Sequence, residues 1–226
     1  MDSSPVMTID GPSGSGKGTV SRAAAKRLGW ALLDSGALYR LVALGGRQAG
    51  VDLNDGEGLA RLARALDIRF DSAPNGDEIV LLDRRDVTRD IRTERAGNDA
   101  SLVAALPAVR SALLERQRRF AQPPGLVADG RDMGTVVFPD ARVKIFLTAS
   151  ANERAERRYK QLKEKGVAAT LAALSKEIAE RDRRDTTRSV SPLVASEDAV
   201  LLDTTGMSVE AVVERVLEFA RERLEV

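Results

Sequence analysis

The first apolar segment of the chain reads V-M-T-I-D at residues 6–10, and G-P-S-G-S-G-K-G-T follows at once at residues 11–19. Glycines at every second or third position let the backbone curl so that its N–H groups converge on one point. The helix expected next would aim its positive end at the same point. Lys17 adds a cation that reaches the outer phosphates of a nucleotide, and Thr19 adds a hydroxyl for Mg²⁺. The order strand, glycine-rich loop, helix predicts a phosphate-binding loop.

This loop departs from the usual G-x-x-x-x-G-K-[ST] pattern at one position. Gly18 follows the lysine, and the hydroxyl residue comes one place later. The variant favours small kinases. A glycine-rich turn that binds nothing is the alternative reading, and the flanking strand and helix patterns speak against it.

Composition restricts the chemistry of the chain. Its 226 residues include 35 Lys and Arg against 34 Asp and Glu, and neither cysteine nor histidine. Without these two residue types there is no disulfide, thiol nucleophile or histidine base. Phosphoryl transfer fits the remaining residues, because it relies chiefly on positioning and charge neutralisation. The balanced charge predicts no attraction to nucleic acid or membranes.

The N-terminal segment lacks the basic and apolar regions of a signal peptide. No apolar run is long enough to span a bilayer. We therefore expect a cytoplasmic protein. The length allows one sizeable core with an insertion or a small second domain.

Short apolar runs alternate with helical patterns along the chain. This alternation predicts an α/β fold, in which parallel strands are covered by helices on both faces. The expected strands are Val6–Ile9, Ala31–Leu33, Leu126–Ala128, Val143–Leu147 and Val200–Leu202. A last helix is expected after Ser208, a suitable N-cap.

Residues 67–93 follow a different pattern. Ile68–Phe70 and Ile79–Leu82 flank a turn at Asn75-Gly76, and Val87 is expected to open a third short strand. No helical pattern separates these runs, so they predict an antiparallel β insertion.

Residues 151–189 are rich in arginine at both ends, and two helices joined near Gly166 would bring these arginines together at the open end of a hairpin. Taken alone, such a charge run indicates a solvated face. Beside a phosphate loop, arginine forks match phosphate oxygens. The arginines are Arg154, Arg157, Arg158, Arg181, Arg183, Arg184 and Arg188.

Two further segments follow predicted strands. In D-S-G-A-L-Y-R, residues 34–40, Ser35 is expected to cap a helix and Arg40 either anchors a phosphate or is merely exposed. In the segment that follows the expected strand Leu126–Ala128, Asp129 would hold the water shell of a metal ion, and Arg131 is a candidate phosphate ligand. Asp132 either binds a ligand or serves a turn.

Four motifs together resemble the bacterial cytidylate kinases, which are nucleoside-monophosphate kinases. The first is shared by many kinases and the other three are far more specific. The likeness runs from about residue 6 to the C-terminus. The motifs are G-P-S-G-S-G-K-G-T, L-L-D-S-G-A-L-Y-R, A-D-G-R-D-M-G-T-V-V-F-P-D-A and E-R-D-R-R-D-T-T-R.

The resemblance implies a single kinase unit with a five-stranded parallel sheet of the phosphate-loop type and a small antiparallel insertion. Its core would comprise residues of about 1–34, 125–150 and 190–226. The monophosphate-binding region would cover about 35–124, and a mobile helical lid about 151–189.

The resemblance also assigns the site residues. The donor triphosphate would be held by Gly11, Pro12, Ser13, Gly14, Ser15, Gly16, Lys17, Gly18 and Thr19, and more loosely by Arg154 and Arg158. The acceptor would be held by Ser35, Arg40, Ser101, Arg110, Arg131, Asp132, Arg181, Asp185 and Arg188. Within that set, cytosine would meet Ser101, Arg110 and Asp132, the ribose Arg181 and Asp185, and the phosphate Arg40, Arg131 and Arg188. Mg²⁺ would be held by Thr19 and, through water, by Asp129. The catalytic charges would be Lys17, Arg40, Arg131, Arg158 and Arg188.

Base chemistry independently favours cytosine. Its N4 amino group donates to a carboxylate or serine oxygen, and its N3 and O2 accept from an arginine. Uracil reverses two of these groups, at a cost of ~1–3 kcal/mol for a buried mismatched pair.

The helix position of Arg110, taken by itself, points to a different role. Arg110 lies at the border of an apolar helical stripe, which favours a surface residue whose charged end snorkels to solvent.

The implied reaction is reversible transfer of the ATP γ-phosphoryl group to CMP or dCMP, with Mg²⁺, by a monomer. One alternative is another acceptor, such as UMP, TMP or shikimate. A second is a nucleotide-dependent switch without acceptor-dependent transfer. A third, nucleic-acid binding through the arginine-rich segment, is opposed by the near-neutral total charge.

Overall fold

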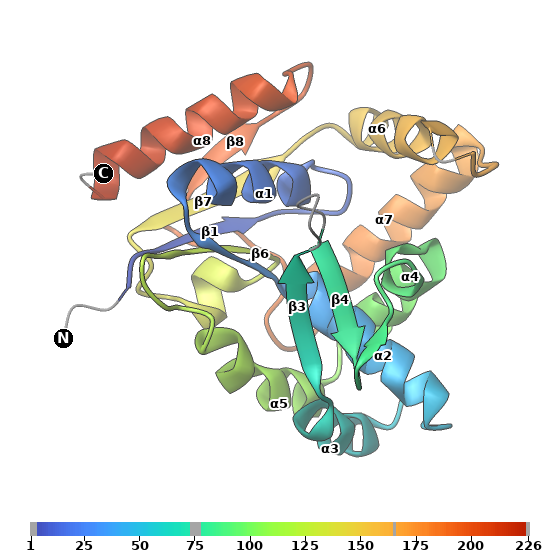
Figure 1. The fold of residues 1–226 in the computed structure, drawn as a ribbon. Helices are drawn as coiled ribbons and strands as arrows, with labels where there is room; N and C mark the ends of the chain where they lie inside the picture. The colour runs from blue at the N-terminus through green and yellow to red at the C-terminus, as the bar shows by residue number, and fades with distance from the viewer. Residues whose placement is uncertain (1–3, 73–77, 165, 225–226) are drawn as a thin grey trace. The chain divides into compact units, whose positions relative to one another are not determined.

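The computed structural model describes residues 4–72, 78–164 and 166–224 (Figure 1). The chain divides into two compact units. The core unit consists of Met1–Asp34 and Arg118–Val226, and the insert unit of Ser35–Gln117.

The core unit is built on a five-stranded parallel sheet in the order β2-β6-β1-β7-β8. The register pairs Asp10, the last residue of β1, with Gly130 at the end of β6. The loops after these strands therefore leave from one edge of the sheet. The strands are β1 Val6–Asp10, β2 Ala31–Asp34, β6 Leu126–Gly130, β7 Val143–Thr148 and β8 Val200–Asp203, which confirms the five predicted strands and the fold class.

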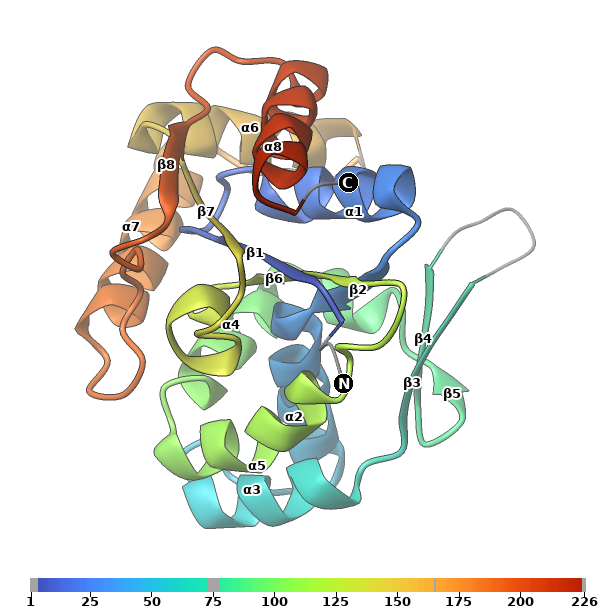
Figure 2. The ribbon, with the colours of Figure 1, turned by 90° about the vertical axis from the view of Figure 1, so that its left-hand side faces the viewer.

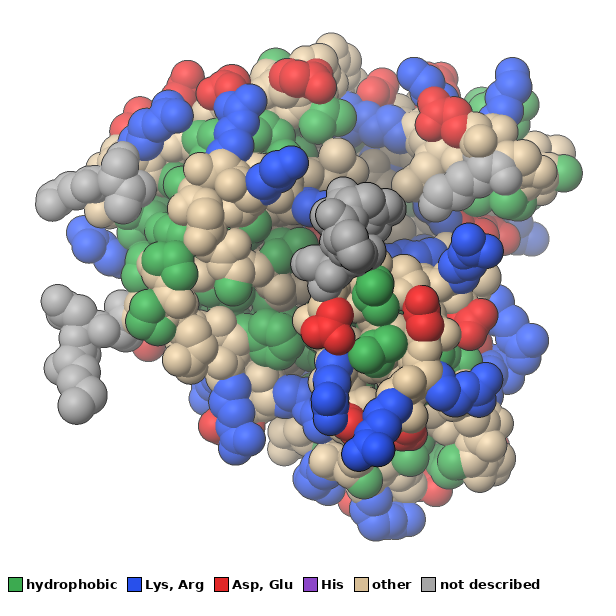
Figure 3. Space-filling model, viewed as in Figure 1, with side chains coloured by type: hydrophobic (Ala, Val, Ile, Leu, Met, Phe, Trp, Pro, Cys, Tyr) green, Lys and Arg blue, Asp and Glu red, His purple; other side chains and the backbone are tan. Residues whose placement is uncertain are grey.

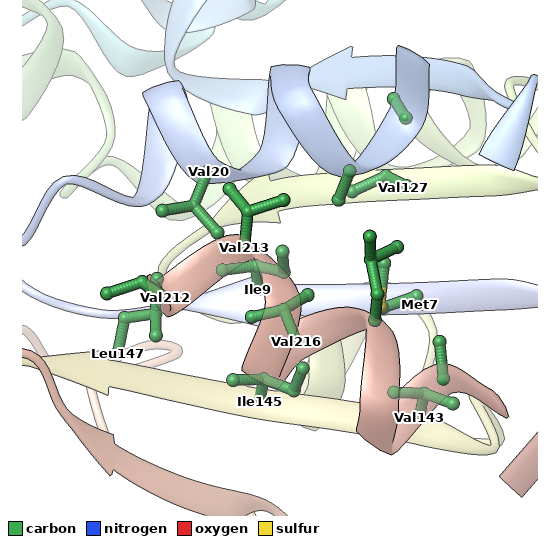
Figure 4. Packing of buried hydrophobic residues seen from close by; sticks show 14 residues of the cluster. Met7, Ile9, Val20, Val127, Val143, Ile145, Leu147, Val212, Val213 and Val216 are labelled. Atoms are coloured by element: carbon green, nitrogen blue, oxygen red, sulfur yellow. The ribbon is translucent and has the colours of Figure 1, made fainter. Parts of the chain in front are cut away.

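Two helices cover one face of this sheet, α1 Lys17–Leu28 and α8 Val209–Leu224 (Figure 2). Alternate residues of the buried strands, such as Met7 and Ile9 of β1, point into a common apolar cluster with both helices (Figure 4). Burying such side chains supplies most of the free energy that holds the layers together. The cluster holds α1 against the sheet, and residues 11–16 connect the end of β1 to the start of this helix.

The other face of β1 packs against a short helix of π type, η2 Met133–Val137. Thr8 points to this face, and a Cβ at Gly134 would lie only 2.9 Å from its Oγ1 atom. Glycine is therefore needed at position 134 for η2 to approach the sheet so closely. This contact fixes the segment that follows β6.

The arginine-rich segment forms two neighbouring helices, α6 Ala151–Glu164 and α7 Leu171–Thr187. Gly166, between them, has a left-handed φ of 70°. The predicted helical hairpin is thereby confirmed. In the part of the chain that the structure describes, no helix has the length and apolar character needed to cross a membrane.

The insert unit contains helices and a separate antiparallel sheet in the order β3-β4-β5. This sheet confirms the predicted β insertion, whose expected turn at Asn75-Gly76 lies outside the described residues. The elements are α2 Ser35–Gln48, α3 Gly56–Ala65, β3 Ile68–Ser72, β4 Glu78–Leu82, β5 Arg85–Asp86, η1 Asp90–Arg92, α4 Glu94–Val103 and α5 Pro107–Arg118.

One prediction for the insertion was wrong. The third strand ends at Asp86 and does not begin at Val87. Asp83 and Arg84 adopt positive φ values of 48° and 67°, so the chain reverses immediately after β4 and pairs earlier than expected. Val87 is buried, and its N–H donates to the carbonyl of Val80.

Candidate active site

The phosphate-loop segment connects β1 to α1. Gly16 is the N-cap of α1 and adopts a left-handed conformation with φ 86° and ψ 0°. Its carbonyl accepts hydrogen bonds from the N–H groups of Thr19 and Val20, both at 3.1 Å. The N–H groups of Lys17 and Gly18, in the first turn of α1, have no intrahelical acceptor. The predicted loop therefore ends at a helix N-terminus, where an anion is favoured.

Lys17 and Asp129 form the charged centre beside this loop. The Oδ2 atom of Asp129 lies 3.2 Å from where a Cβ on Gly18 would be, so the buried carboxylate faces the start of α1. Burial raises the pKa of Asp129, and the charge of Lys17 opposes that rise. Burial lowers the pKa of Lys17, and the positive charge of Arg131 lowers it further. An anionic phosphate at this point would favour the ammonium form of Lys17.

The same place suits a hard cation. Thr19 is exposed in the first turn of α1, next to the glycine that Asp129 faces. Hydroxyl and carboxylate oxygens are donors that Mg²⁺ accepts, with water and phosphate completing its octahedral shell. No group of three acidic side chains able to hold a metal ion occurs among the described residues.

A second charged cluster joins the end of β6 to α7. Arg131 Nε donates to Asp185 Oδ2 at 2.9 Å, and both side chains are largely buried. Burial alone would raise the pKa of Asp185, but the charge and hydrogen bond of Arg131, with Arg188 and Arg181, hold that pKa below its usual value. Four predicted site residues thus share one electrostatic cluster. Because Arg131 and Arg181 also lower the pKa of Lys17, the cluster lies within electrostatic reach of the phosphate loop.

Asp132 lies at the N-cap position of η2 but makes no capping hydrogen bond with its side chain. The residue is 2% exposed. The backbone carbonyl of Asp132 accepts from Val136 at 2.9 Å and from Val137 at 3.2 Å. The carboxylate is thus not used for the cap, and its assignment to the cytosine ring stays a prediction.

Asp10 is a residue that the sequence did not single out. Its two carboxylate oxygens accept from the N–H groups of Met133 and Gly134, at 2.9 and 2.8 Å. Burial raises the pKa of Asp10 to about 7, and these two hydrogen bonds oppose the rise. Asp10 therefore anchors the segment that carries Arg131 and Asp132. The sequence did contain a signal for this role, because Asp10 is an acidic residue at the carboxyl end of β1, immediately before the phosphate loop.

The insert unit carries the other four predicted acceptor residues. Ser35 was expected to cap α2, but it is the first residue of that helix, because β2 runs into α2 without a connecting residue. Arg40 Nη1 donates to the carbonyl of Ile91 at 2.8 Å. Ser101 is buried on α4, and its hydroxyl makes no hydrogen bond to any residue that the structure describes. A buried hydroxyl in this condition is suited to a ligand.

Arg110 is buried on α5 with 7% exposure, so the reading as a snorkelling surface residue was wrong. Its Nη1 donates to the carbonyl of Ala104 at 3.1 Å. Its guanidinium carbon lies 5.7 Å from the centre of the Tyr39 ring, within the range of a cation–π contact. The helix stripe could not reveal this, because the ring and carbonyl belong to other segments.

The arginines at the start of the hairpin differ in their contacts. Arg154 is buried and donates to the carbonyls of Ala149 and Ser13, at 3.1 and 3.0 Å. It also pairs with Asp182 at 2.6 Å. Arg158 is partly exposed and contacts Gln161. The expected contact of both arginines with ATP stays a prediction, and Arg154 already uses several donors within the protein.

Comparison with known proteins identifies the family. The family model described as "Cytidylate kinase" matches residues 7–222. A cytidylate kinase of Pseudomonas fluorescens (strain SBW25) is 60% identical over 94% of this chain and 93% of its own length. That of Stutzerimonas stutzeri (strain A1501) is 59% identical over 97% and 96%. A solved gluconokinase from Sinorhizobium meliloti 1021, with TM-score 0.48, 17% identity and coverage of 98% and 94%, is too distant to bear on function. On this sequence match and the phosphate-loop fold described above, the chain belongs to the cytidylate kinase family.

Proposed function

We propose that this enzyme transfers the γ-phosphoryl group of ATP reversibly to the phosphate of CMP or dCMP, giving ADP and CDP or dCDP. One observation carries the proposal. Lys17 at the phosphate loop and the cluster around Arg131 and Asp185 belong to one compact unit and influence each other electrostatically. Two anionic substrates have to be brought together in such a reaction, and this cationic arrangement is what they require.

The donor side would bind the triphosphate at the start of α1. The N–H groups of Lys17 and Gly18, in the first turn of α1, and the ammonium of Lys17 would approach its oxygens. Thr19 and Asp129 would hold Mg²⁺, the latter through water, and the chemistry supplied by a bound ion would be neutralisation of phosphate charge. A bound phosphate would raise the lowered pKa of Lys17 and so favour the charged form of the lysine in the complex.

The acceptor side would place the monophosphate against arginines. Arg131, Arg188 and, from the insert unit, Arg40 are proposed to hold the phosphate. These guanidiniums cancel the repulsion between the substrates and stabilise the charge of a loose transition state. No general base is needed, because the attacking phosphate oxygen is already anionic. Arg158 would add charge from the hairpin α6–α7, the proposed lid, whose closure would exclude water.

Selection of cytosine is proposed for Asp132, Arg110 and Ser101. Each is buried, and the Ser101 hydroxyl has no partner within the described ranges. The N4 amino group would donate to an oxygen of Asp132 or Ser101, and Arg110 would donate to N3 and O2. Asp185 and Arg181 would meet the ribose. A uracil ring would face the carboxylate with a carbonyl and bind more weakly.

An acceptor panel tests the proposal. ADP release is measured with ATP and Mg²⁺ and, in turn, CMP, dCMP, UMP, TMP and shikimate. We expect rapid release with CMP and dCMP, and at least a tenfold lower kcat/KM with UMP. Faster transfer to UMP, TMP or shikimate would assign another acceptor. Slow ATP hydrolysis that no acceptor stimulates would indicate a nucleotide-dependent switch.

Variants sharpen the same experiment. Asp132→Asn keeps the size of the side chain but adds a donor opposite N4, so the preference for CMP over UMP should fall by roughly tenfold. Glu180→Gln, on the exposed face of α7, serves as the control and should keep the preference.

We further propose that the enzyme acts as a cytoplasmic monomer. Size-exclusion chromatography with light scattering tests the oligomeric state.

A further inference from the structure

Two arginines of α6 hold the backbone of the phosphate loop from outside. Arg154 Nη1 donates to the carbonyl of Ser13 at 3.0 Å, and Arg157 Nη1 donates to the carbonyl of Ser15 at 3.3 Å. The two arginines are three residues apart, so they lie on one side of α6. The two carbonyls that they bind are likewise alternate groups of the loop.

These hydrogen bonds determine where the next N–H groups point. In a trans peptide the C=O and the following N–H lie in one plane and point in opposite directions. The N–H groups of Gly14 and Gly16 are therefore turned away from α6. Both glycines adopt left-handed conformations, with φ 79° and 86°. Alternation of such residues with ordinary ones produces the concave array of N–H groups that binds anions.

The guanidinium of Arg157 is itself fixed at the end of the sheet. It donates to Thr204 at both Oγ1 and the backbone carbonyl, at 2.9 and 2.6 Å, and pairs with Glu153 at 2.8 Å. Thr204 is buried, and both its N–H and its hydroxyl donate to the carbonyl of Thr148 at the end of β7. The Ser15 carbonyl is thus tied to the sheet through one side chain.

We propose that Arg157 is a positioning residue, which sets the peptide plane between Ser15 and Gly16 so that the loop is ready for the donor triphosphate. This inference rests on the proposed binding of the donor at the loop, and it gives Arg157 no contact with the substrate. Because the loop is already ordered, we expect binding of the triphosphate to lose less conformational entropy. The residue acts through backbone geometry and not through its charge alone.

Measurements of ligand binding, with no phosphoryl transfer taking place, test this role. Isothermal titration calorimetry measures the affinities of Arg157→Ala and Arg157→Lys for inorganic triphosphate with Mg²⁺, and separately for CMP. We expect roughly tenfold weaker triphosphate binding for both variants, because a lysine cannot reach Ser15 and both Thr204 acceptors together. CMP affinity should stay within about twofold of the wild-type value. Arg215→Ala, which removes an exposed arginine of α8, is the matched control and should bind both ligands normally.

Any of the following results would overturn the role of Arg157. Wild-type triphosphate affinity in Arg157→Lys would mean that charge alone matters. Wild-type affinity in Arg157→Ala would mean that the contact is dispensable. Equal losses for triphosphate and CMP would indicate a general structural defect. If Arg157→Ala fails to fold, Thr204→Val loosens the same guanidinium from the sheet and should weaken triphosphate binding severalfold; unchanged binding would contradict the role.

The outcome is separable from that of the proposed function. A protein that binds triphosphate but transfers nothing to CMP would refute the proposed acceptor and leave the role of Arg157 standing. If the protein phosphorylates CMP but its Arg157 variants bind triphosphate normally, the role of Arg157 would be refuted and the proposed function would stand.

Discussion

The ion pair of Asp185 and Arg131 contributes to the stability of the fold and also belongs to the charged cluster of the proposed site. Their ion pair joins α7 to the segment after β6 at 2.9 Å, with side chains 8% and 19% exposed. Burial of the carboxyl opposes its ionisation, but the charge and hydrogen bond of Arg131, together with the charges of Arg188 and Arg181, more than compensate, so the pKa of Asp185 lies below its usual value. Such a lowered pKa links the free energy of unfolding to pH.

We predict that Asp185→Asn lowers the free energy of unfolding by about 1–3 kcal/mol at pH 7. The stabilisation by the ionised carboxylate is complete above its unfolded pKa, near 3.8, and is lost as pH falls through the lower folded pKa. The difference in unfolding free energy between wild type and variant should therefore shrink below about pH 4. Urea unfolding at several pH values between 7 and 3 measures this difference. A difference that stays constant over this range would contradict the assignment, and Glu180→Gln on the same helix should produce little change.

At the scale of elements, α8 illustrates how local sequence and packing cooperate. Ser208 precedes the helix, and its hydroxyl accepts from the N–H of Ala211 at 3.2 Å, as the sequence predicted. The apolar stripe of α8 then packs on the sheet and on α1 through Val213, Val216 and neighbouring residues. The cap defines where the helix begins, and the stripe defines which face is buried.

Replacing the cap should have a measurable cost. We predict that Ser208→Ala lowers the free energy of unfolding by about 0.5–2 kcal/mol, because one N–H of the first turn loses its acceptor. Ser208→Asp retains an acceptor and should stay close to wild type. Urea denaturation monitored by circular dichroism provides the comparison. Equal stability of all three proteins would show that the cap contributes nothing, and kinetics with CMP should be the same in each.

At the scale of the whole molecule, charge is balanced. The sequence carries 35 basic and 34 acidic residues. On the face drawn in Figure 3, basic and acidic side chains are interspersed. Many of the described arginines are paired with carboxylates, among them Arg47 with Asp99 and Arg92 with Glu78. The arginines of the proposed site are local charges within this balanced background.

This balance predicts weak binding to nucleic acid. A labelled DNA duplex should bind with a dissociation constant no tighter than the micromolar range at about 0.15 M salt, which is the non-specific level. Fluorescence anisotropy over a series of salt concentrations measures it. Nanomolar binding with a steep salt dependence would revive the reading of the arginine-rich segment as a nucleic-acid surface.

The predictions that succeeded depended on local signals. Apolar runs located the five parallel strands, and Ser208 located the start of α8. Family membership followed from four motifs and is confirmed by the match over residues 7–222. Val87 was misplaced because the positive φ values of Asp83 and Arg84 leave no clear trace in residue type.

The sequence by itself therefore determined the strand order along the chain, the phosphate-loop segment and the family. Only the tertiary structure decided that Asp10 holds the N–H groups of residues 133 and 134, and that Arg157 reaches Ser15 and Thr204. The physical reason is separation along the chain. Periodicity and backbone preference act over a few residues, whereas these hydrogen bonds join segments that meet only when the sheet and its covering helices have packed.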